Sequence, residues 1–327
     1  IIGKDSNIDV NFFTIKYDND YSKLRIVKDG DNSRSPIVKD SENSESFIVK
    51  DGKNSEASIS MYKNGKLAKN IFHYKKKVDK TDYLYRKHVY YNENEEVHRD
   101  DDKPALIIYN EAGVIEEYFC DKGKIHRKPN TQGEDQPAVI LYNEKDMDKS
   151  PFIEYVYYCD HGKIHSNINT KGEVQPAVIR YNKKNKIIEE HFYYQGKKHS
   201  NKNTQGVDQP AVILYNKEGK YTGKVIEKHF YFEGKKHSNK NTQGVYQPAV
   251  IRYNEEGKDK GMVIEEHFYD KGVLQSNKNT QGEDQPAIII YNEEGKDKGK
   301  VVKELFYSNG KIHRKPNTQG EDQPAVI

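Results

Sequence analysis

Long apolar segments are missing from this sequence, and apolar residues are scarce overall. No run of 18 apolar residues occurs in the 327-residue chain, which excludes a transmembrane helix, and no apolar core of a signal peptide is present. Hydrophobic residues make up 34% of the chain. Even with Gly included, the apolar share is about 41%, below the roughly 45–50% that is typical of globular domains. A thick hydrophobic core is therefore not expected.

An excess of charge of one sign is also missing, as is Trp. The chain has 54 Lys and Arg against 51 Asp and Glu, a net charge of +3 at 32% charged residues. This balance gives a solubilising surface rather than a polycation, so we expect no capture of nucleic acid or of anionic membranes. Disordered chains are poor in aromatic residues, whereas 25 Tyr and 11 Phe are present here. The composition favours a thin, extended, Tyr-rich fold.

A short repeat occupies the N-terminal part of the chain. The motif Ile-Val-Lys-Asp begins at Ile26, Ile37 and Ile48, each time followed by a turn of the Asp/Gly/Asn/Ser type that ends in Asn-Ser. This pattern indicates a short strand and a turn in each copy. A low-complexity spacer is the alternative, because each copy offers little to bury. We assign residues 1–62 to this β cap or spacer and residues 63–103 to a transition with a first degenerate unit.

A longer repeat fills residues 104–327. Its Pro-Ala motif recurs every 33 to 39 residues, at Pro104, Pro137, Pro176, Pro210, Pro248, Pro286 and Pro324. Residues 249–253 and 263–269 of one copy are β-branched and aromatic and lie between Gly-containing turns, so two strands are predicted per copy. The fold predicted from these hairpins is all-β, an elongated single-layer antiparallel array. A β-solenoid with parallel stacking is the alternative.

One loop of the repeat keeps a constant length. From the His of Lys-x-His, or Gln275 in one copy, to the next Pro is always 11 residues, and Asn-Thr-(Gln/Lys)-Gly lies between them. A loop that scaffolds itself through its Asn, Thr and Gly residues is one explanation. A row of equivalent loops presented to a partner is the other, with these candidate residues: Asn130, Thr131, Gln132, Asn169, Thr170, Asn203, Thr204, Gln205, Asn241, Thr242, Gln243, Asn279, Thr280, Gln281, Asn317, Thr318 and Gln319.

The two ends of the sequence both fall inside repeat copies. Ile1 to Asn7 are similar to the later IVKDSEN segment, and the last residues stop inside a Pro-Ala-Val-Ile motif that elsewhere continues to a Tyr. We therefore expect the sequence to be a segment of a longer protein.

The repeat also resembles a known family. His98-Arg99, an acidic spacer and Pro104-Ala105, together with Gly123-Lys124-Ile125-His126-Arg127, resemble the GK-x-HR-x-DGPA repeats of proteins from amoeba-infecting giant viruses. These repeats are similar to MORN repeats and to bacterial antitoxin-type MORN variants. The resemblance covers residues 83–327, although the unit here is about 38 residues where MORN units have about two dozen. It implies a twisted antiparallel ribbon of hairpins that scaffolds partners and has no common catalytic residues.

Strand direction limits the topology of such an array. An antiparallel meander needs an even number of strands per copy, because successive copies could not otherwise be related by translation. We therefore expect Lys-x-His and the following Pro-Ala-Val-Ile to form one interrupted strand. Cys120 and Cys159 hold equivalent positions in adjacent copies, and a disulfide between them would contradict the meander, which separates them beyond the roughly 7 Å limit. Two Cys are too few to identify the compartment.

Recurring His and Glu residues are the candidates for chemistry. Five His occupy the Lys-x-His position, but a metal site needs several ligands that converge on one ion, so cross-strand packing is the favoured interpretation. Paired Glu residues such as Glu189-Glu190 and Glu265-Glu266 recur in several copies, whereas active sites are singular, and charge pairing with Arg180, Arg252 or Lys is expected instead. The Gly-Lys motifs lack Walker spacing. No catalytic, cofactor-binding or metal-binding residue is assigned.

These observations predict a non-enzymatic structural or scaffold protein. Equivalent repeated surfaces give avidity for a multivalent partner, and sheet edges allow self-assembly. We expect protein partners or self-assembly, no nucleic acid and no membrane span, and, from the viral resemblance, a fibre or assembly element in the virion or the viral factory of the host cytoplasm. The alternative is a binding module, such as an immunity or antitoxin-type protein or an adhesin-like one.

Overall fold

The computed structural model describes most of the chain as two compact units. The described residues are 37–40, 45–51, 57–63, 66–78, 81–143, 152–169, 171–203, 206–241, 243–255, 261–294, 296–315 and 321–327. One unit comprises residues 1–125 with 142–151, and the other comprises residues 126–141 with 152–327. The first Ile-Val-Lys-Asp copy, at Ile26, lies outside the described residues.

The first unit is a meander of antiparallel strands. They are β1 (Ile37–Asp40), β2 (Glu45–Asp51), β3 (Ala57–Lys63), β4 (Lys66–Val78), β5 (Thr81–Tyr90), β6 (Leu106–Asn110) and β7 (Gly113–Tyr118), and each pairs with the next. The strand expected in each Ile-Val-Lys-Asp motif is present in the second and third copies, which pair as Ile37 with Ile48. Buried side chains are few and include Ile59, Ile71 and Tyr85.

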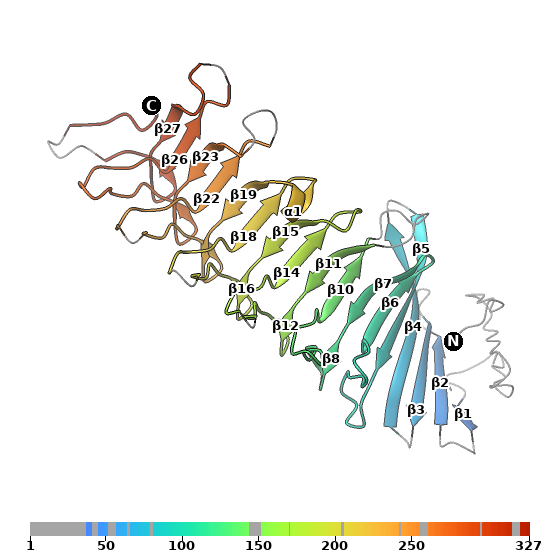
Figure 1. The fold of residues 1–327 in the computed structure, drawn as a ribbon. Helices are drawn as coiled ribbons and strands as arrows, with labels where there is room; N and C mark the ends of the chain where they lie inside the picture. The colour runs from blue at the N-terminus through green and yellow to red at the C-terminus, as the bar shows by residue number, and fades with distance from the viewer. Residues whose placement is uncertain are drawn as a thin grey trace. The chain divides into compact units, whose positions relative to one another are not determined.

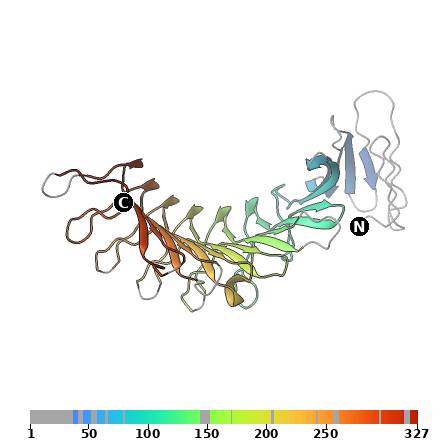
Figure 2. The same cartoon turned by 90° about the horizontal axis from the view of Figure 1, so that it is seen from above.

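The long strands of the second unit lie side by side in chain order (Figure 1). They are β10 (Val139–Tyr142), β11 (Ile153–Tyr157), β14 (Val178–Tyr181), β15 (Ile187–His191), β18 (Val212–Tyr215), β19 (Val225–His229), β22 (Val250–Tyr253), β23 (Val263–His267), β26 (Ile288–Tyr291) and β27 (Val301–Leu305). From β11 to β27 every neighbouring pair is antiparallel. Figure 2 shows them as one layer. The predicted all-β hairpin array is confirmed, and the parallel coil of the alternative does not occur among the described strands.

A short hairpin follows each pair of long strands. These hairpins are β8 (Cys120–Asp121) with β9 (Lys124–Ile125) in the first unit, and β12 (Cys159–Asp160) with β13 (Lys163–Ile164), β16 (Tyr193–Tyr194) with β17 (Lys197–Lys198), β20 (Tyr231–Phe232) with β21 (Lys235–Lys236), β24 (Tyr269–Asp270) with β25 (Val273–Leu274) and β28 (Tyr307–Ser308) with β29 (Lys311–Ile312) in the second. The number of strands per copy is therefore even, as expected. Lys163–Ile164 pairs with Cys159–Asp160, and Val178–Arg180 pairs with Tyr155–Tyr157 of the same return segment. Lys-x-His and Pro-Ala-Val-Ile therefore lie along one return segment as an interrupted strand, as expected, with the Asn-Thr-(Gln/Lys)-Gly loop between them. The tight turn before Lys-x-His folds that segment back onto the strand before it.

The tight turn of each short hairpin has a left-handed backbone. In β24–β25 both turn residues have positive φ, 46° at Lys271 and 93° at Gly272. Two successive positive φ angles are typical of the two-residue turns whose twist matches that of a hairpin, and the second residue is Gly in every copy. The turn of one copy also contacts the copy before it, because the Gly272 N–H donates to the Lys236 carbonyl at 2.8 Å.

The core of the array is thin and is built on the Ala of Pro-Ala. Ala138, Ala177, Ala211, Ala249 and Ala287 are all 0% exposed. The Ala249 N–H donates to the His267 carbonyl of the following strand, and the Ala249 carbonyl accepts from Phe230 of the preceding one. Ala249 is thus held between two backbones, where a larger side chain would overpack the site. Pro248, Val250 and Phe268 of this copy are also buried.

Two further expectations concern cysteines and membrane-spanning helices. Cys120 and Cys159 are both free and half-buried, and burial raises the pKa of each thiol to about 11. The Cys120–Cys159 disulfide that would contradict the meander is therefore not formed. α1 (Gly219–Thr222), the only helix in the described residues, has four residues. In the described part of the chain no helix is long and apolar enough to cross a membrane.

Candidate functional site

Each Asn-Thr-(Gln/Lys)-Gly loop is held by its own Asn side chain. Asn130 Oδ1 accepts from the backbone N–H groups of Gln132 and Glu134, both at 2.9 Å. Asn130 Nδ2 donates to the Glu134 carboxylate at 2.9 Å, and Gly133 takes a φ of 77°. The side chain thus replaces a backbone partner inside the turn, which is the usual role of Asn in such loops.

The same hydrogen bonds recur in the other described loops. Asn279 repeats all three of them, and Asn241 Oδ1 accepts from Gln243 at 2.9 Å and from Val245 at 3.0 Å. The loop stems are closed by isolated β-bridges, for example Lys240 with Tyr246. The loops therefore scaffold themselves, and their Asn side chains are occupied internally.

The loop tips are the part that faces solvent. Exposed candidate residues at the tips are Thr131, Gln132, Gln243, Thr280 and Gln281, and the loop-holding Asn203 and Asn241 are exposed as well. Their role in binding stays a prediction. The candidates Thr170, Thr204, Gln205, Thr242, Asn317, Thr318 and Gln319 lie outside the described residues.

A buried Ser joins each of several copies to the next. Ser238 Oγ accepts from the Tyr269 N–H at 3.0 Å, and the Ser238 N–H donates to the Tyr269 carbonyl at 2.8 Å. Ser166, Ser200 and Ser276 make the same pair of bonds to Tyr193, Tyr231 and Tyr307. Ser238 is 1% exposed, so these bonds are shielded from water. No local sequence pattern predicts this link, because the partners are 31 residues apart in the chain.

The His of Lys-x-His acts as a hydrogen-bond acceptor. His165, His199 and His237 Nδ1 accept from the first turn residue of the next short hairpin at 3.4, 3.5 and 3.3 Å. Gln275, which replaces His in one copy, places Oε1 2.9 Å from the Asn309 N–H and makes the equivalent bond. Gln275 can therefore replace His because both side chains supply an acceptor, and one hydrogen bond of this kind accounts for His165, His199, His237 and Gln275.

Aromatic rings lie between these His residues in the middle of the second unit. Tyr194 lies 5.7 Å from His165 and 5.9 Å from His199, measured between ring centroids. Phe232 lies 5.5 Å from His199 and 6.0 Å from His237. Tyr194 and Phe232 are 53% and 46% exposed, so this row of five rings faces solvent at the short hairpins.

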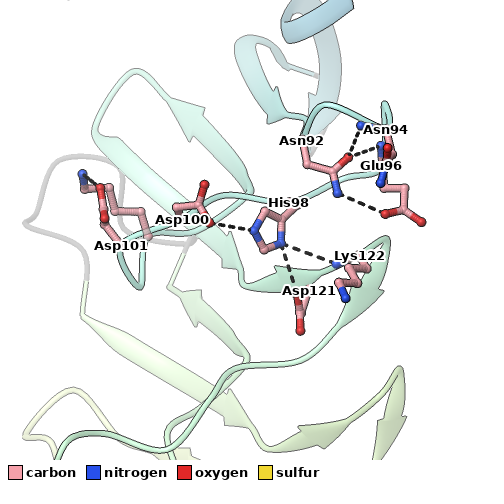
Figure 3. Close-up of polar contacts among 9 residues, drawn as sticks. Asn92, Asn94, Glu96, His98, Asp100, Asp101, Asp121 and Lys122 are labelled. Carbon is pink, nitrogen blue, oxygen red and sulfur yellow. Dashed lines mark hydrogen bonds and ion pairs between the residues drawn. The ribbon is translucent and has the colours of Figure 1, made fainter.

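The shortened copy in the first unit places a His among carboxylates (Figure 3). His98 Nε2 lies 3.0 Å from Asp100, and Nδ1 lies 3.3 Å from Asp121 and 3.4 Å from the Lys122 N–H. Nearby, Asn92 Oδ1 accepts from two backbone N–H groups at 3.0 Å each, as the loop Asn residues do. Figure 3 shows these groups at one end of the strands, around a turn.

The paired Glu residues bind different partners. Glu189 accepts from Arg180 at 2.7 Å, and Arg180 also reaches Glu154 at 3.3 Å. A hydrogen bond from His191, with a smaller contribution from Arg180, holds the pKa of Glu189 below its ordinary value. The neighbouring Glu190 is buried and binds elsewhere, to Tyr215 at 2.6 Å and Lys220 at 2.7 Å.

A second Arg bridge repeats the first. Arg252 lies 2.6 Å from Glu265 and 3.2 Å from Glu227. The expected charge pairing of these Glu residues with Arg180, Arg252 and a Lys is thus confirmed. The two carboxylates of each consecutive pair bind different partners, because successive residues of a strand point to opposite faces of the sheet.

Two His residues and an Asp form a cluster that the sequence pattern did not predict. His126, Asp160 and His161 place one ligand-type atom each within 4.8 Å of one another. His161 occupies the first turn position of its short hairpin, where other copies have Lys122, Gln195, Glu233, Lys271 and Asn309. An alignment of the copies on this turn shows that His161 is the one His at this position, and this is the signal by which the cluster could have been predicted. The free cysteine Cys159 directly precedes Asp160 in the chain.

Comparison with known proteins gives no family assignment. No family model matches the chain, and no curated protein matches it. Among solved structures, a porin-like protein from Bacteroides uniformis aligns over 69% of this chain and 91% of its own, at 9% identity and a TM-score of 0.12. This similarity is too low to carry an argument about fold or function.

Proposed function

We propose that this chain is a non-enzymatic scaffold whose row of self-supported loops makes multivalent contacts with a protein partner. The observation that carries the proposal is the repeated loop: the same Asn-centred hydrogen bonds recur in the described copies and leave the loop tips exposed. A rigid loop loses little conformational entropy on binding. Equivalent loops on one array add avidity without needing a strong single site.

The distribution of polar residues supports a scaffold over an enzyme. The carboxylates, Arg and Ser residues that recur in the copies are engaged in repeated structural bonds. Enzyme active sites combine differently perturbed groups in a single place, whereas these bonds repeat along the array. The resemblance to giant-virus repeats supports the further proposal that the scaffold acts in the virion or the viral factory.

Light scattering combined with cross-linking tests the proposal. The purified full chain is measured over a range of concentrations, alone and with extract from its source, and cross-linked peptides are identified by mass spectrometry. The proposal predicts assemblies with cross-links in several copies of the loop. A chain that stays monomeric at all concentrations and binds nothing would contradict it, and cross-links confined to one copy would favour a binding module with a single site.

A further inference from the structure

His126, Asp160 and His161 are the strongest group of metal-ligating side chains among the described residues. His126 Nδ1 lies 3.6 Å from Asp160 Oδ1, and His161 Nδ1 is hydrogen-bonded to the same carboxylate oxygen. All three atoms lie within 4.8 Å of one another. Two ligands that share one tetrahedral zinc ion at bonds of about 2.0–2.1 Å are about 3.3 Å apart. Small side-chain rotations would therefore bring the three atoms onto one ion.

His126 differs from the other His residues of its column in one way that points to a ligand. In three of the later copies and in His98, Nδ1 accepts a hydrogen bond from the backbone N–H of the first turn residue. Among the described residues, His126 Nδ1 is buried and has no hydrogen-bond partner. A buried nitrogen without a partner is costly, and a metal ion would satisfy its lone pair.

The missing partner coincides with the singular side chain at the turn. His161 has a φ of 46°, the same left-handed conformation as Lys271 in its own copy. Its ring stacks on that of His126 with centroids 4.6 Å apart and an interplanar angle of 25°. The side chain is 66% exposed and Asp160 is 56% exposed, so an ion can reach both from solvent.

We propose that His126, Asp160 and His161 form a binding site for a divalent transition-metal ion, with zinc as the representative ion. Two imidazoles and one carboxylate suit zinc and related first-row ions, whereas calcium and magnesium prefer oxygen ligands alone. Three protein ligands leave a fourth position for water or for a group from a partner. The ion would join His126 to the short hairpin of the next copy, where the other copies use a hydrogen bond.

The repeat itself supplies conservative variants for the test. His161→Gln introduces the residue found at the equivalent turn position, Gln195, and His126→Gln introduces the residue found in the same column, Gln275. Both replacements therefore keep a side chain that the chain already accommodates there. His199→Gln is the matched control, because His199 is in the same column but has Phe232 beside it instead of a carboxylate.

Isothermal titration of the full chain with zinc chloride measures the effect, and circular dichroism verifies that each variant folds. One equivalent of zinc is expected to bind the wild type and the His199→Gln variant with the same affinity. The His161→Gln and His126→Gln variants are each expected to lose at least about 100-fold in affinity. Absence of zinc binding to the wild type would overturn the proposal. Equal affinity of the wild type and the His161→Gln variant, or an equal loss in the His199→Gln variant, would overturn it as well.

Discussion

The link between copies makes a quantitative prediction at Ser238. Replacing Ser238 with Ala removes the Oγ that accepts from the Tyr269 N–H at 3.0 Å, and this part-buried N–H is left without that partner. Ser238 is 1% exposed, so water does not replace the lost bond. An unsatisfied buried donor costs about 1–3 kcal/mol. Thr280→Ala, at an exposed loop tip, is the control and is expected to change stability by less than about 0.5 kcal/mol.

Hydrogen exchange at the Tyr269 amide measures this cost locally. Stability in a repeat array is a sum of terms between neighbouring copies, so the loss should be concentrated near the substituted link. In the Ser238→Ala variant the Tyr269 amide is expected to exchange about 5- to 150-fold faster than in the wild type, and the urea midpoint should fall. Unchanged exchange at Tyr269, with a midpoint equal to that of the Thr280→Ala control, would refute the role assigned to Ser238.

Three further predictions concern pH, charge and backbone conformation. Burial, with Lys69 and Arg86 adding to it, lowers the pKa of His88 to about 3, so the unfolded chain binds a proton that the folded chain does not. The free energy of unfolding should therefore decrease as pH falls below about 6.5, by about 1 kcal/mol at pH 5 after allowance for solvent screening. In a His88→Gln variant, urea unfolding midpoints should not show this decrease. Arg252→Gln removes two ion pairs of a side chain that is 48% exposed, so the free energy of unfolding should fall by about 0.5 kcal/mol. Because salt screens such pairs, the loss should vanish in 1 M salt. A loss that persists in 1 M salt would mean that Arg252 acts through packing. Gly272→Ala places a Cβ at a φ of 93° and should lower the free energy of unfolding, measured in urea, by about 1 kcal/mol. An unchanged urea midpoint would mean that the turn relaxes to accept the Cβ.

The strands of the array were predictable because their pattern is local. The predicted strands at residues 249–253 and 263–269 correspond to β22 and to β23 with β24. The break between β23 and β24 at Phe268 was not predictable. Strand-like residues continue through this position, but the Phe268 N–H pairs with Ala287 of the next copy and the ring is buried. Tertiary contacts therefore decide where the strand ends.

The candidate site could be predicted only in part for a similar reason. The self-scaffolding of the loops followed from Asn and Gly in a segment of constant length, which is local information. The Ser–Tyr links and the cluster at His161 depend on which residues of one copy lie beside the next. That register is set by the pairing of neighbouring copies, which no local pattern of residues shows.

Loop-by-loop substitution tests the central claim, that the repeated loops act together as a multivalent surface. Exposed tip residues are changed to Glu one after another, at Gln132, Lys171, Gln243 and Gln281, while the Asn residues that hold the loops are kept. Affinity for the cross-linked partner is measured by surface plasmon resonance after each step. The account predicts a stepwise loss with each added substitution. Complete loss from a single substitution, or no loss from all four, would contradict it.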